Sequence, residues 1–326
     1  MRAVAAMRAT TDPRAGLDAI LSGLRVGEWP EPEPPEGWTT VEVRAAGVNH
    51  HDLWTLRGIG IPLERLPVVL GAEAAGVDDE GREVLVYPVI GTPTFGDENL
   101  DPACQYLSVD FDGTFAERVA VPRECLVPKP AELTWEEAAC LPGAWLTAYR
   151  MLFEKAELDK GSTVLVQGAG GGVATALITL GAAAGFRMWV TSRDPRRRSR
   201  AVELGADRAF PPGARLPERV DAVMETVGAA TWEHSLAVLR PGGRIVVSGA
   251  TSGPVTELNL ARVFYRQLSI VGSTMGTREQ LQRLAQFCVD TGVRPTIDRV
   301  FALDDAVAAL RALARGEVFG KLVLRP

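Results

Sequence analysis

The sequence has few cysteines and no paired cysteine motif. Its four cysteines, Cys104, Cys125, Cys140 and Cys288, lie far apart in the 326 residues. This spacing excludes a zinc ribbon and gives no basis for a disulfide framework. We therefore expect most of these side chains to be small core residues.

An excess of positive charge is also missing. The 35 Lys and Arg residues are outnumbered by 41 Asp and Glu residues, which gives a formal net charge of −6. Nucleic-acid binding needs a basic face, and so does a helix that lies on an anionic membrane. The composition therefore argues against both kinds of partner.

No segment has the length and hydrophobicity of a membrane span. The longest run of small apolar residues, 172–185, is interrupted by Thr175 and Thr179, whereas a span needs about 20 largely apolar residues. We interpret it as a buried helix. The first residues, MRAVAAMRATTD, lack an apolar core followed by a cleavage site, so we expect no secretory signal and a cytoplasmic protein.

Two kinds of pattern divide the chain. Up to about residue 125, short runs such as VEVRAAGV, GREVLVYP and FAERVAVP alternate apolar and polar residues between Gly and Pro, which predicts a β-rich part. From about residue 127, apolar strands alternate with helices, which predicts a parallel sheet covered on both faces. The length is sufficient for two domains.

Several elements have clear ends. The helical segment TWEEAACLPGAWLTAYRML begins with Thr134 and Glu137, which form a capping-box pattern. The segment PRRRSRAVELGA predicts a helix that ends at Gly205. Two amphipathic helices and a last strand, KLVLR, close the chain, and residues 91–113 predict a long polar loop.

The turn that follows the strand STVLVQ carries the main functional signal. It reads GAGGGVA, residues 168–174, and opens a helix. Small residues let a backbone approach a pyrophosphate, and a helix N-terminus offers free N–H groups. The spacing departs from G-x-G-x-x-G, and such a turn can also serve close packing alone, but the strand before it and the βαβ pattern after it favour a dinucleotide. We assign cofactor contacts to Gly168, Gly171, Gly172 and Val173.

The end of the next strand bears on the choice between NAD and NADP. An NAD site has an acidic side chain there, which accepts from the ribose 2′-hydroxyl. Here Ser192 and Arg193 follow the strand, and Arg197 lies in an arginine cluster just beyond. Guanidinium groups bind phosphate oxygens, so these three residues favour the 2′-phosphate of NADP(H). Asp194 opposes this interpretation if its carboxylate points inward, and the arginines can also form a solvated helix face.

Taken together, these motifs resemble the medium-chain dehydrogenase/reductase superfamily over nearly the whole chain. The segments that carry the resemblance are AAGVNHHDLWTLRG, LGAEAAG, DGTFAERVAVP, LPGAWLTAYRML, GAGGGVA, ELGADRAF, METVG, LRPGGRIVVSGATSG and GKLVL. The zinc-free quinone oxidoreductase branch is the most similar. The resemblance implies an α/β fold, with a GroES-like β-rich catalytic domain of residues 1–126 and 276–326. A Rossmann domain with a doubly wound parallel sheet, residues 127–275, would bind NADP(H).

The resemblance also implies where zinc-bearing relatives hold their metal. Their ligands fall at Asn49, Ala72 and Gly143, none of which can bind zinc here. The structural-zinc lobe of those relatives corresponds to residues 91–113, which retain only Cys104. Because a tetrahedral site needs four ligands, we expect no metal.

Two histidines, His50 and His51, stand side by side. On an extended segment their side chains point to opposite faces, which hinders chelation. The resemblance places His51 at a proton-relay position and His50 at a pyrophosphate contact, and an imidazole with a pKa of about 6.5 can pass a proton. Alternatively, His51 and Asp52 only hydrogen-bond each other. Asn49 is our candidate for a contact to the oxyanion or the nicotinamide ribose, because its amide donates without titrating.

Other positions follow from the same resemblance. Trp54 stands where many quinone oxidoreductases have a tyrosine, and an indole releases no useful proton, so we expect it to line the substrate pocket with Trp145. The remaining candidates for cofactor contacts are Thr147, Gly249, Ala250, Ser273 and Lys321.

Without zinc there is no strong Lewis acid to polarise a simple ketone. Hydride addition to a quinone or an enone is less demanding, because the acceptor spreads the resulting charge. We therefore predict a zinc-independent NADPH-dependent reductase of quinones or of the C=C bond of α,β-unsaturated carbonyl compounds. The alternatives are a zinc-free carbonyl reductase that uses His51 and a non-catalytic NADP(H)-binding protein. The apolar edge strand LSIVGSTM predicts a homodimer.

Overall fold

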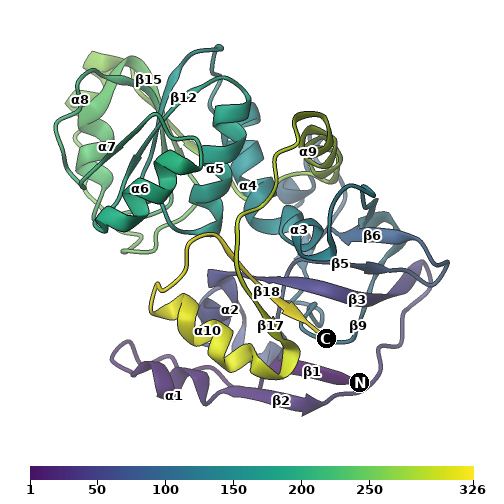
Figure 1. Ribbon diagram of the computed structural model, residues 1–326. Helices are drawn as coiled ribbons and strands as arrows, with labels where there is room; N and C mark the ends of the chain where they lie inside the picture. The colour runs from purple at the N-terminus through teal and green to yellow at the C-terminus, as the bar shows by residue number, and fades with distance from the viewer. The chain divides into compact units, whose positions relative to one another are not determined.

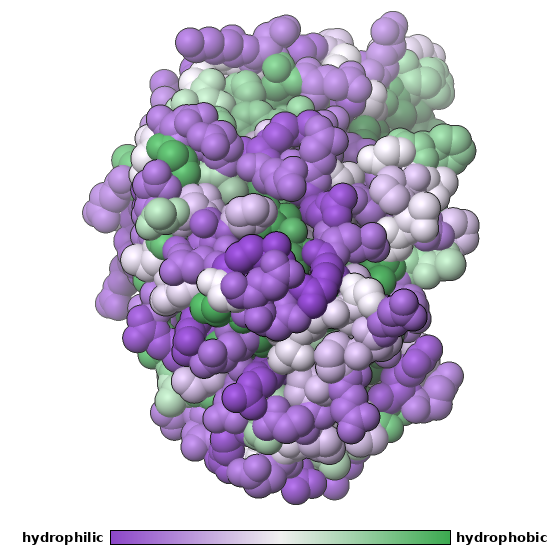
Figure 2. All heavy atoms as spheres, turned by 90° about the vertical axis from the view of Figure 1, so that its right-hand side faces the viewer, coloured by the Kyte–Doolittle hydropathy of each residue, from purple (hydrophilic) through white to green (hydrophobic).

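The computed structural model describes residues 1–326, which fall into two units (Figure 1). Unit 1 comprises Met1–Ala144 and Thr277–Pro326, and unit 2 comprises Trp145–Gly276. No helix combines the length and the hydrophobicity that crossing a membrane requires. The face drawn in Figure 2 is mostly hydrophilic, with smaller hydrophobic areas between the polar side chains.

Unit 1 is built around a mixed seven-stranded sheet with the order β10-β6-β5-β3-β18-β17, in which β9 also pairs with β3. Its strands are β3 (Trp38–Val48), β5 (Ala74–Val77), β6 (Glu83–Val86), β9 (Arg118–Pro122), β10 (Leu126–Pro128), β17 (Ile297–Ala302) and β18 (Lys321–Arg325). A three-stranded sheet contains β1 (Arg2–Ala6), β2 (Leu24–Glu28) and β4 (Val68–Val69), and a two-stranded one contains β7 (Val89–Ile90) and β8 (Gln105–Tyr106). Both chain ends therefore contribute to one unit.

Five α-helices accompany these sheets. They are α1 (Leu17–Leu21), α2 (His50–Thr55), α3 (Trp135–Ala139), α9 (Arg278–Thr291) and α10 (Ala306–Ala314). A continuous hydrophobic core joins strand residues such as Val4 and Val43 to Leu310 of α10. The predicted capping box at Thr134 and Glu137 is present at the start of α3.

Unit 2 is a six-stranded parallel sheet with the order β13-β12-β11-β14-β15-β16. The strands are β11 (Thr163–Val166), β12 (Arg187–Thr191), β13 (Arg208–Phe210), β14 (Val220–Glu225), β15 (Leu239–Val247) and β16 (Ser269–Gly272). The helices are α4 (Leu146–Arg150), α5 (Gly172–Ala183), α6 (Pro195–Glu203), α7 (Trp232–Val238) and α8 (Leu260–Arg266). Because the strands are parallel, all their carboxyl ends meet at one edge, and the loops after them lie there.

The predicted α/β class, with a β-rich unit and a parallel-sheet unit, is confirmed. The compact units divide the chain at other points than expected, since residues 127–144 lie in unit 1 and Gly276 lies in unit 2. Helix α3 in this segment contacts β3 and β5, and Glu136 forms an ion pair with Arg325. These contacts attach the segment to the sheet of unit 1.

Candidate functional site

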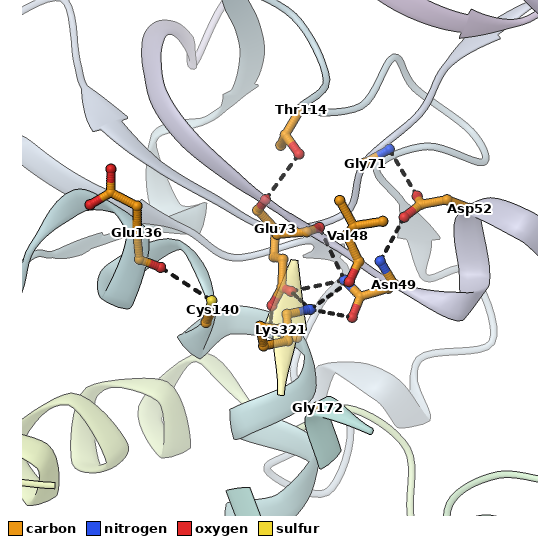
Figure 3. A network of polar contacts seen from close by, with 12 residues as sticks. Val48, Asn49, Asp52, Gly71, Glu73, Thr114, Glu136, Cys140, Gly172 and Lys321 are labelled. Carbon is orange, nitrogen blue, oxygen red and sulfur yellow. Dashed lines mark hydrogen bonds and ion pairs between the residues drawn. The ribbon is translucent and has the colours of Figure 1, made fainter. Parts of the chain in front are cut away.

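A buried ion pair lies within unit 1, between Lys321 and Glu73 (Figure 3). The Lys321 Nζ is 2.5 Å from Glu73 Oε1, and the two side chains are 2% and 0% exposed. The same ammonium donates to Val48 O at 2.8 Å and to Asn49 Oδ1 at 2.7 Å. All three of its N–H donors therefore have acceptors inside unit 1.

Strand pairing explains why these two residues meet. Lys321 begins β18, which pairs with β3 on one side, with Leu322 opposite Val48. Glu73 directly precedes β5, which pairs with β3 on the other side. Gly47 of β3 leaves room between them, because a Cβ at this position would lie 2.3 Å from Glu73 Oε1.

The second oxygen of Glu73 is also occupied. Its Oε2 accepts from Gly143 N at 2.6 Å, and the backbone oxygen of Glu73 accepts from Thr114 Oγ1 at 3.1 Å. A Cβ at Gly143 would lie 2.4 Å from Oε2. Any side chain at position 143 would therefore have to displace the Glu73 carboxylate.

The donor set here does not fit zinc. Asn49 and Gly143, two of the positions where zinc-bearing relatives carry ligands, both bond to the Glu73 carboxylate, and Ala72 precedes Glu73. A catalytic zinc needs three protein ligands from Cys, His or carboxylate, whereas these positions offer an amide, a methyl group and no side chain. No group of three or more His, Cys, Asp or Glu residues could hold a metal ion.

The amide of Asn49 is held on both sides. Its Nδ2 donates to Glu73 Oε1 at 2.9 Å and to Gly47 O at 3.3 Å, and its Oδ1 accepts from Lys321. Both N–H donors thus have acceptors in unit 1, and a contact to an oxyanion would require the longer of the two bonds to break. The assignment of Asn49 to that contact stays a prediction, and so does that of Lys321 to the cofactor.

His50 and His51 lie in the first turn of helix α2, not on an extended segment as the sequence suggested. Neighbouring residues on a helix still point roughly 100° apart, so the two rings do not converge on one ion. The helix starts here because the Asp52 carboxylate accepts from Asn49 N at 2.8 Å. The other oxygen of the Asp52 carboxylate accepts from Gly71 N at 3.1 Å.

The alternative in which His51 bonds to Asp52 is therefore wrong, since the Asp52 carboxylate takes backbone donors instead. The Nδ1 of His51 is buried without a partner. Burial lowers the pKa of His51 below its ordinary value, so the imidazole is neutral near neutral pH. A neutral imidazole has one donor and one acceptor nitrogen.

The cofactor candidates of unit 2 lie along the carboxyl edge of its sheet. Gly168 follows β11 with a φ of +87°, a conformation that favours glycine. Gly171 is the N-cap of α5, and no side chain caps that helix, so its first N–H groups remain available to an anion. Arg197 lies against the same turn, because a Cβ at Gly170 would lie 3.0 Å from its Nη1.

The carboxylate of Asp194 is engaged at the start of helix α6. Its side chain accepts from Arg196 N and caps α6. Ser192 and Arg193 follow β12, and Arg193 is exposed. The tip of β12 therefore presents a hydroxyl and a guanidinium, which is the feature that favours a 2′-phosphate.

The other predicted residues are placed as follows. Gly249 and Ala250 follow β15, and Ser273 follows β16 with a buried hydroxyl that has no partner. Thr147 in α4 and Trp145 are buried, Trp54 is half-buried in α2, and His50 is exposed. These placements leave the predicted roles of the residues untested.

Comparisons with known proteins agree with this architecture. Residues 35–131 match the alcohol dehydrogenase GroES-like domain, and residues 172–290 match the zinc-binding dehydrogenase domain. A quinone oxidoreductase of Pseudomonas aeruginosa is 31% identical, with 91% of this chain and 93% of that protein covered. The chain belongs to the medium-chain dehydrogenase/reductase superfamily. It is an oxidoreductase of this superfamily, and the resemblance inferred from its motifs is confirmed.

Other proteins match nearly the whole of this chain. An acryloyl-coenzyme A reductase of Metallosphaera sedula is 28% identical, with 93% and 96% of the two chains covered. A solved NAD-dependent alcohol dehydrogenase is 35% identical with a TM-score of 0.89, covering 100% of both chains. The 2-octenoyl-CoA carboxylase reductase CinF, solved with NADP and 2-octenoyl-CoA, is 26% identical with a TM-score of 0.91, covering 99% and 87%.

Sequence reasoning missed the ion pair. Glu73 received no role, and Lys321 was assigned only to the cofactor. The signal was present, because each is a lone charge in an apolar run, LGAEAAG and KLVL. A buried charge needs a partner. Two such residues of opposite charge are therefore expected to form an ion pair with each other.

We predict that the two members of the pair are strongly coupled in stability. Lys321→Met leaves the Glu73 carboxylate buried without its cation and should lower the free energy of unfolding by about 3–5 kcal/mol. Lys321→Met combined with Glu73→Leu should cost less than the sum of the two single changes. Urea unfolding of the wild type, the two single variants and the double variant measures the coupling free energy. Strictly additive losses would contradict the coupling.

The pH dependence of stability should reveal Asp52. Burial raises the pKa of its carboxyl from 3.8 to about 7, against the opposing backbone hydrogen bonds. The folded state therefore keeps a proton that the unfolded chain releases, so this stabilisation is full below the unfolded pKa and is lost as the pH rises to about 7. Relative to Asp52→Asn, the wild type should lose roughly 1.4 kcal/mol per pH unit in this window and then level off.

The measurement is the free energy of unfolding of both proteins between pH 5 and pH 8. Taking the difference cancels the other titrating groups. A difference that does not change with pH, or that changes in the wild type's favour, would show that the hydrogen bonds from Asn49 N and Gly71 N outweigh burial.

Proposed function

We propose that this oxidoreductase is zinc-independent and NADPH-dependent, and that it reduces quinones or the C=C bond of α,β-unsaturated carbonyl compounds. The observation that carries the proposal is the Glu73–Lys321 ion pair, around which two of the expected ligand positions are arranged. A carboxylate that is already paired with an ammonium and a backbone N–H has little left to offer a metal ion. This arrangement of Glu73 and Lys321 therefore favours a reaction that needs no Lewis acid.

The cofactor assignment rests on unit 2. The glycine turn 168–174 and the uncapped start of α5 suit a pyrophosphate, and Ser192, Arg193 and Arg197 suit a 2′-phosphate. The relative CinF was solved with NADP, whereas the alcohol dehydrogenase relative is described as NAD-dependent. The arginines, together with the capping role of Asp194, are the reason to propose NADPH.

When bound, NADPH supplies a hydride. The chain's own contribution is to keep the acceptor oriented and to exchange a proton near it. His51 is the residue proposed for that exchange, as a neutral imidazole whose pKa is lowered by burial. An acceptor that delocalises the added charge onto its oxygen needs hydrogen-bond donors rather than a dication.

The acceptor class follows from this requirement. Quinones and conjugated carbonyl compounds both spread negative charge after hydride addition. One relative is named a quinone oxidoreductase and another an acryloyl-coenzyme A reductase, and these names support the same two classes as the first compounds to test. Assays with individual quinones and conjugated carbonyl compounds identify the acceptor that the chain reduces.

Activity after chelation tests the proposal. Protein treated with a chelator should still oxidise NADPH in the presence of a quinone or of acryloyl-CoA. It should do so with kcat/KM at least about tenfold higher for NADPH than for NADH, corresponding to about 1.4 kcal/mol. Initial rates at 340 nm measure both.

Three outcomes would contradict it. Turnover that appears only when zinc is restored would show a metal enzyme. Faster reduction of saturated ketones than of enones would favour the carbonyl-reductase alternative, and NADPH binding without turnover on any acceptor would favour the non-catalytic one.

We also propose that the chain forms a homodimer through β16. This strand is the edge of the six-stranded sheet, and exposed apolar side chains gather just before it and in it. Leu260 is 68% exposed, Phe264 62%, Tyr265 81% and Ile270 39%. An unpaired edge beside apolar side chains is a liability that pairing with a second copy removes.

Light scattering coupled to size-exclusion chromatography tests this assembly. The wild type should elute with twice the mass of one chain, and Ile270→Lys should shift it towards the monomer because a charge would be buried at the strand edge. Ile59→Lys, at an exposed apolar residue of unit 1, is the matched control and should leave the mass unchanged. A monomeric wild type would refute the dimer.

A further inference from the structure

Unit 2 also contains a fully buried carboxylate, Glu225, at the carboxyl end of β14. It is 0% exposed. Its Oε1 accepts from Val227 N at 2.8 Å and Gly228 N at 3.0 Å, and its Oε2 accepts from Ser235 Oγ at 2.6 Å. The Thr231 hydroxyl lies 2.9 Å from both oxygens. Because a carboxylate can only accept, the direction of each of these bonds is fixed.

That direction propagates to the glycine turn. The hydrogen of Ser235 Oγ points to Glu225, so the oxygen of Ser235 accepts from Gln167 Nε2 at 3.0 Å. The Gln167 Oε1 then accepts from Thr191 Oγ1 at 2.7 Å, and Thr191 Oγ1 accepts from Gly168 N at 3.3 Å. One carboxylate thus orients a chain of buried side chains that ends at the first glycine of the turn 168–174.

The chain also fixes His234. The second N–H of Gln167 Nε2 points to His234 Nδ1 at 3.0 Å, and His234 Nε2 lies 2.9 Å from Ala214 O. Since Gln167 donates, Nδ1 accepts and Nε2 carries the proton, which it donates to Ala214 O. Both N–H groups and the oxygen of the Gln167 amide therefore have partners, and a fully satisfied network of this kind holds one geometry.

A second branch leads from Glu225 to the loop after β15. The turn that Glu225 holds, residues 226–231, bonds to residues 249–253 through Ser252 N to Val227 O at 2.7 Å and Ala229 N to Gly253 O at 3.1 Å. The two segments touch, because a Cβ at Gly228 would lie 2.9 Å from the Cα of Ala250. Gly249 and Ala250 are the residues assigned to the cofactor in this loop.

We propose that Glu225, Gln167 and Thr191 are positioning residues for the dinucleotide. They set the geometry of the turn 168–174 and of the loop 249–253, both at the carboxyl edge of the sheet. The inference rests on the proposed function, since it takes NADPH as the ligand. It adds that the affinity for NADPH depends on side chains that the sheet edge hides from the cofactor.

Thr191→Val tests the proposal, because valine has the shape of threonine without its hydroxyl. The Kd for NADPH, measured by fluorescence titration, should rise about 5- to 10-fold, the equivalent of about 1–1.4 kcal/mol for one hydrogen bond. The kcat at saturating NADPH should stay within about twofold, because the turn contributes to binding of the dinucleotide and not to the chemical step. Thr191→Ser keeps the hydroxyl and should restore wild-type affinity.

Thr163→Val is the matched control. Thr163 lies in the neighbouring strand β11, is equally buried, and its hydroxyl has no partner. It stands at the amino end of its strand, at the opposite edge of the sheet from the turn. This variant should bind NADPH as the wild type does, so it separates the effect of the chain from that of a threonine lost from a buried strand.

Ser235→Ala provides a second break in the chain, between Glu225 and Gln167, if Thr191→Val does not fold. It should weaken NADPH binding in the same sense. Unchanged Kd in a folded Thr191→Val or Ser235→Ala protein would overturn the proposal, and so would equal losses in Thr191→Ser and Thr191→Val. A wild type that binds no NADPH would instead refute the proposed function, which keeps the two failures distinguishable.

Discussion

The attraction between Lys321 and Glu73 is the interaction on which unit 1 depends most. Either charge alone in the interior would cost several kcal/mol, so the two residues must stay together. Their remaining hydrogen-bonding capacity is filled by Val48 O, Asn49 and Gly143 N. These groups come from segments far apart in the chain, so the pair is satisfied only when the strands β3, β5 and β18 are in register.

In unit 2, too, a buried charge has its hydrogen-bonding capacity filled by the protein. Glu225 is buried as completely as Glu73, but its partners are neutral N–H and O–H groups instead of an ammonium. Glu73 also accepts from neutral donors, Asn49 Nδ2 and Gly143 N, but it has a cation as well. The Glu73–Lys321 pair thus joins β18 to the start of β5, whereas Glu225 orders the turn after β14.

Local structure was predictable because local chemistry decides it. The capping box at Thr134 and the glycine turn before α5 each depend on residues only a few positions apart. The helical start at His50 was missed, although Asn49 and Asp52 stand at the spacing of an N-cap and its N3 partner.

The site was less accessible than the elements that carry it. Glu73 and Lys321 are 248 positions apart, and their contact follows from the order of the strands in the sheet, which periodicity does not determine. The position of residues 127–144 was missed for the same reason, since contacts of α3 with β3 and β5 decide it. Distances that depend on which strands are neighbours require the fold.

The pairing of β18 with β3 also determines when the ion pair can form during synthesis. β3 is synthesised early, but β18, one of the strands that pair with it, begins at Lys321. This strand is made after all of unit 2. Unit 2 is continuous and can fold as its own strands emerge. Until residues 277–326 follow, Glu73 lacks the ammonium with which it pairs in the folded protein.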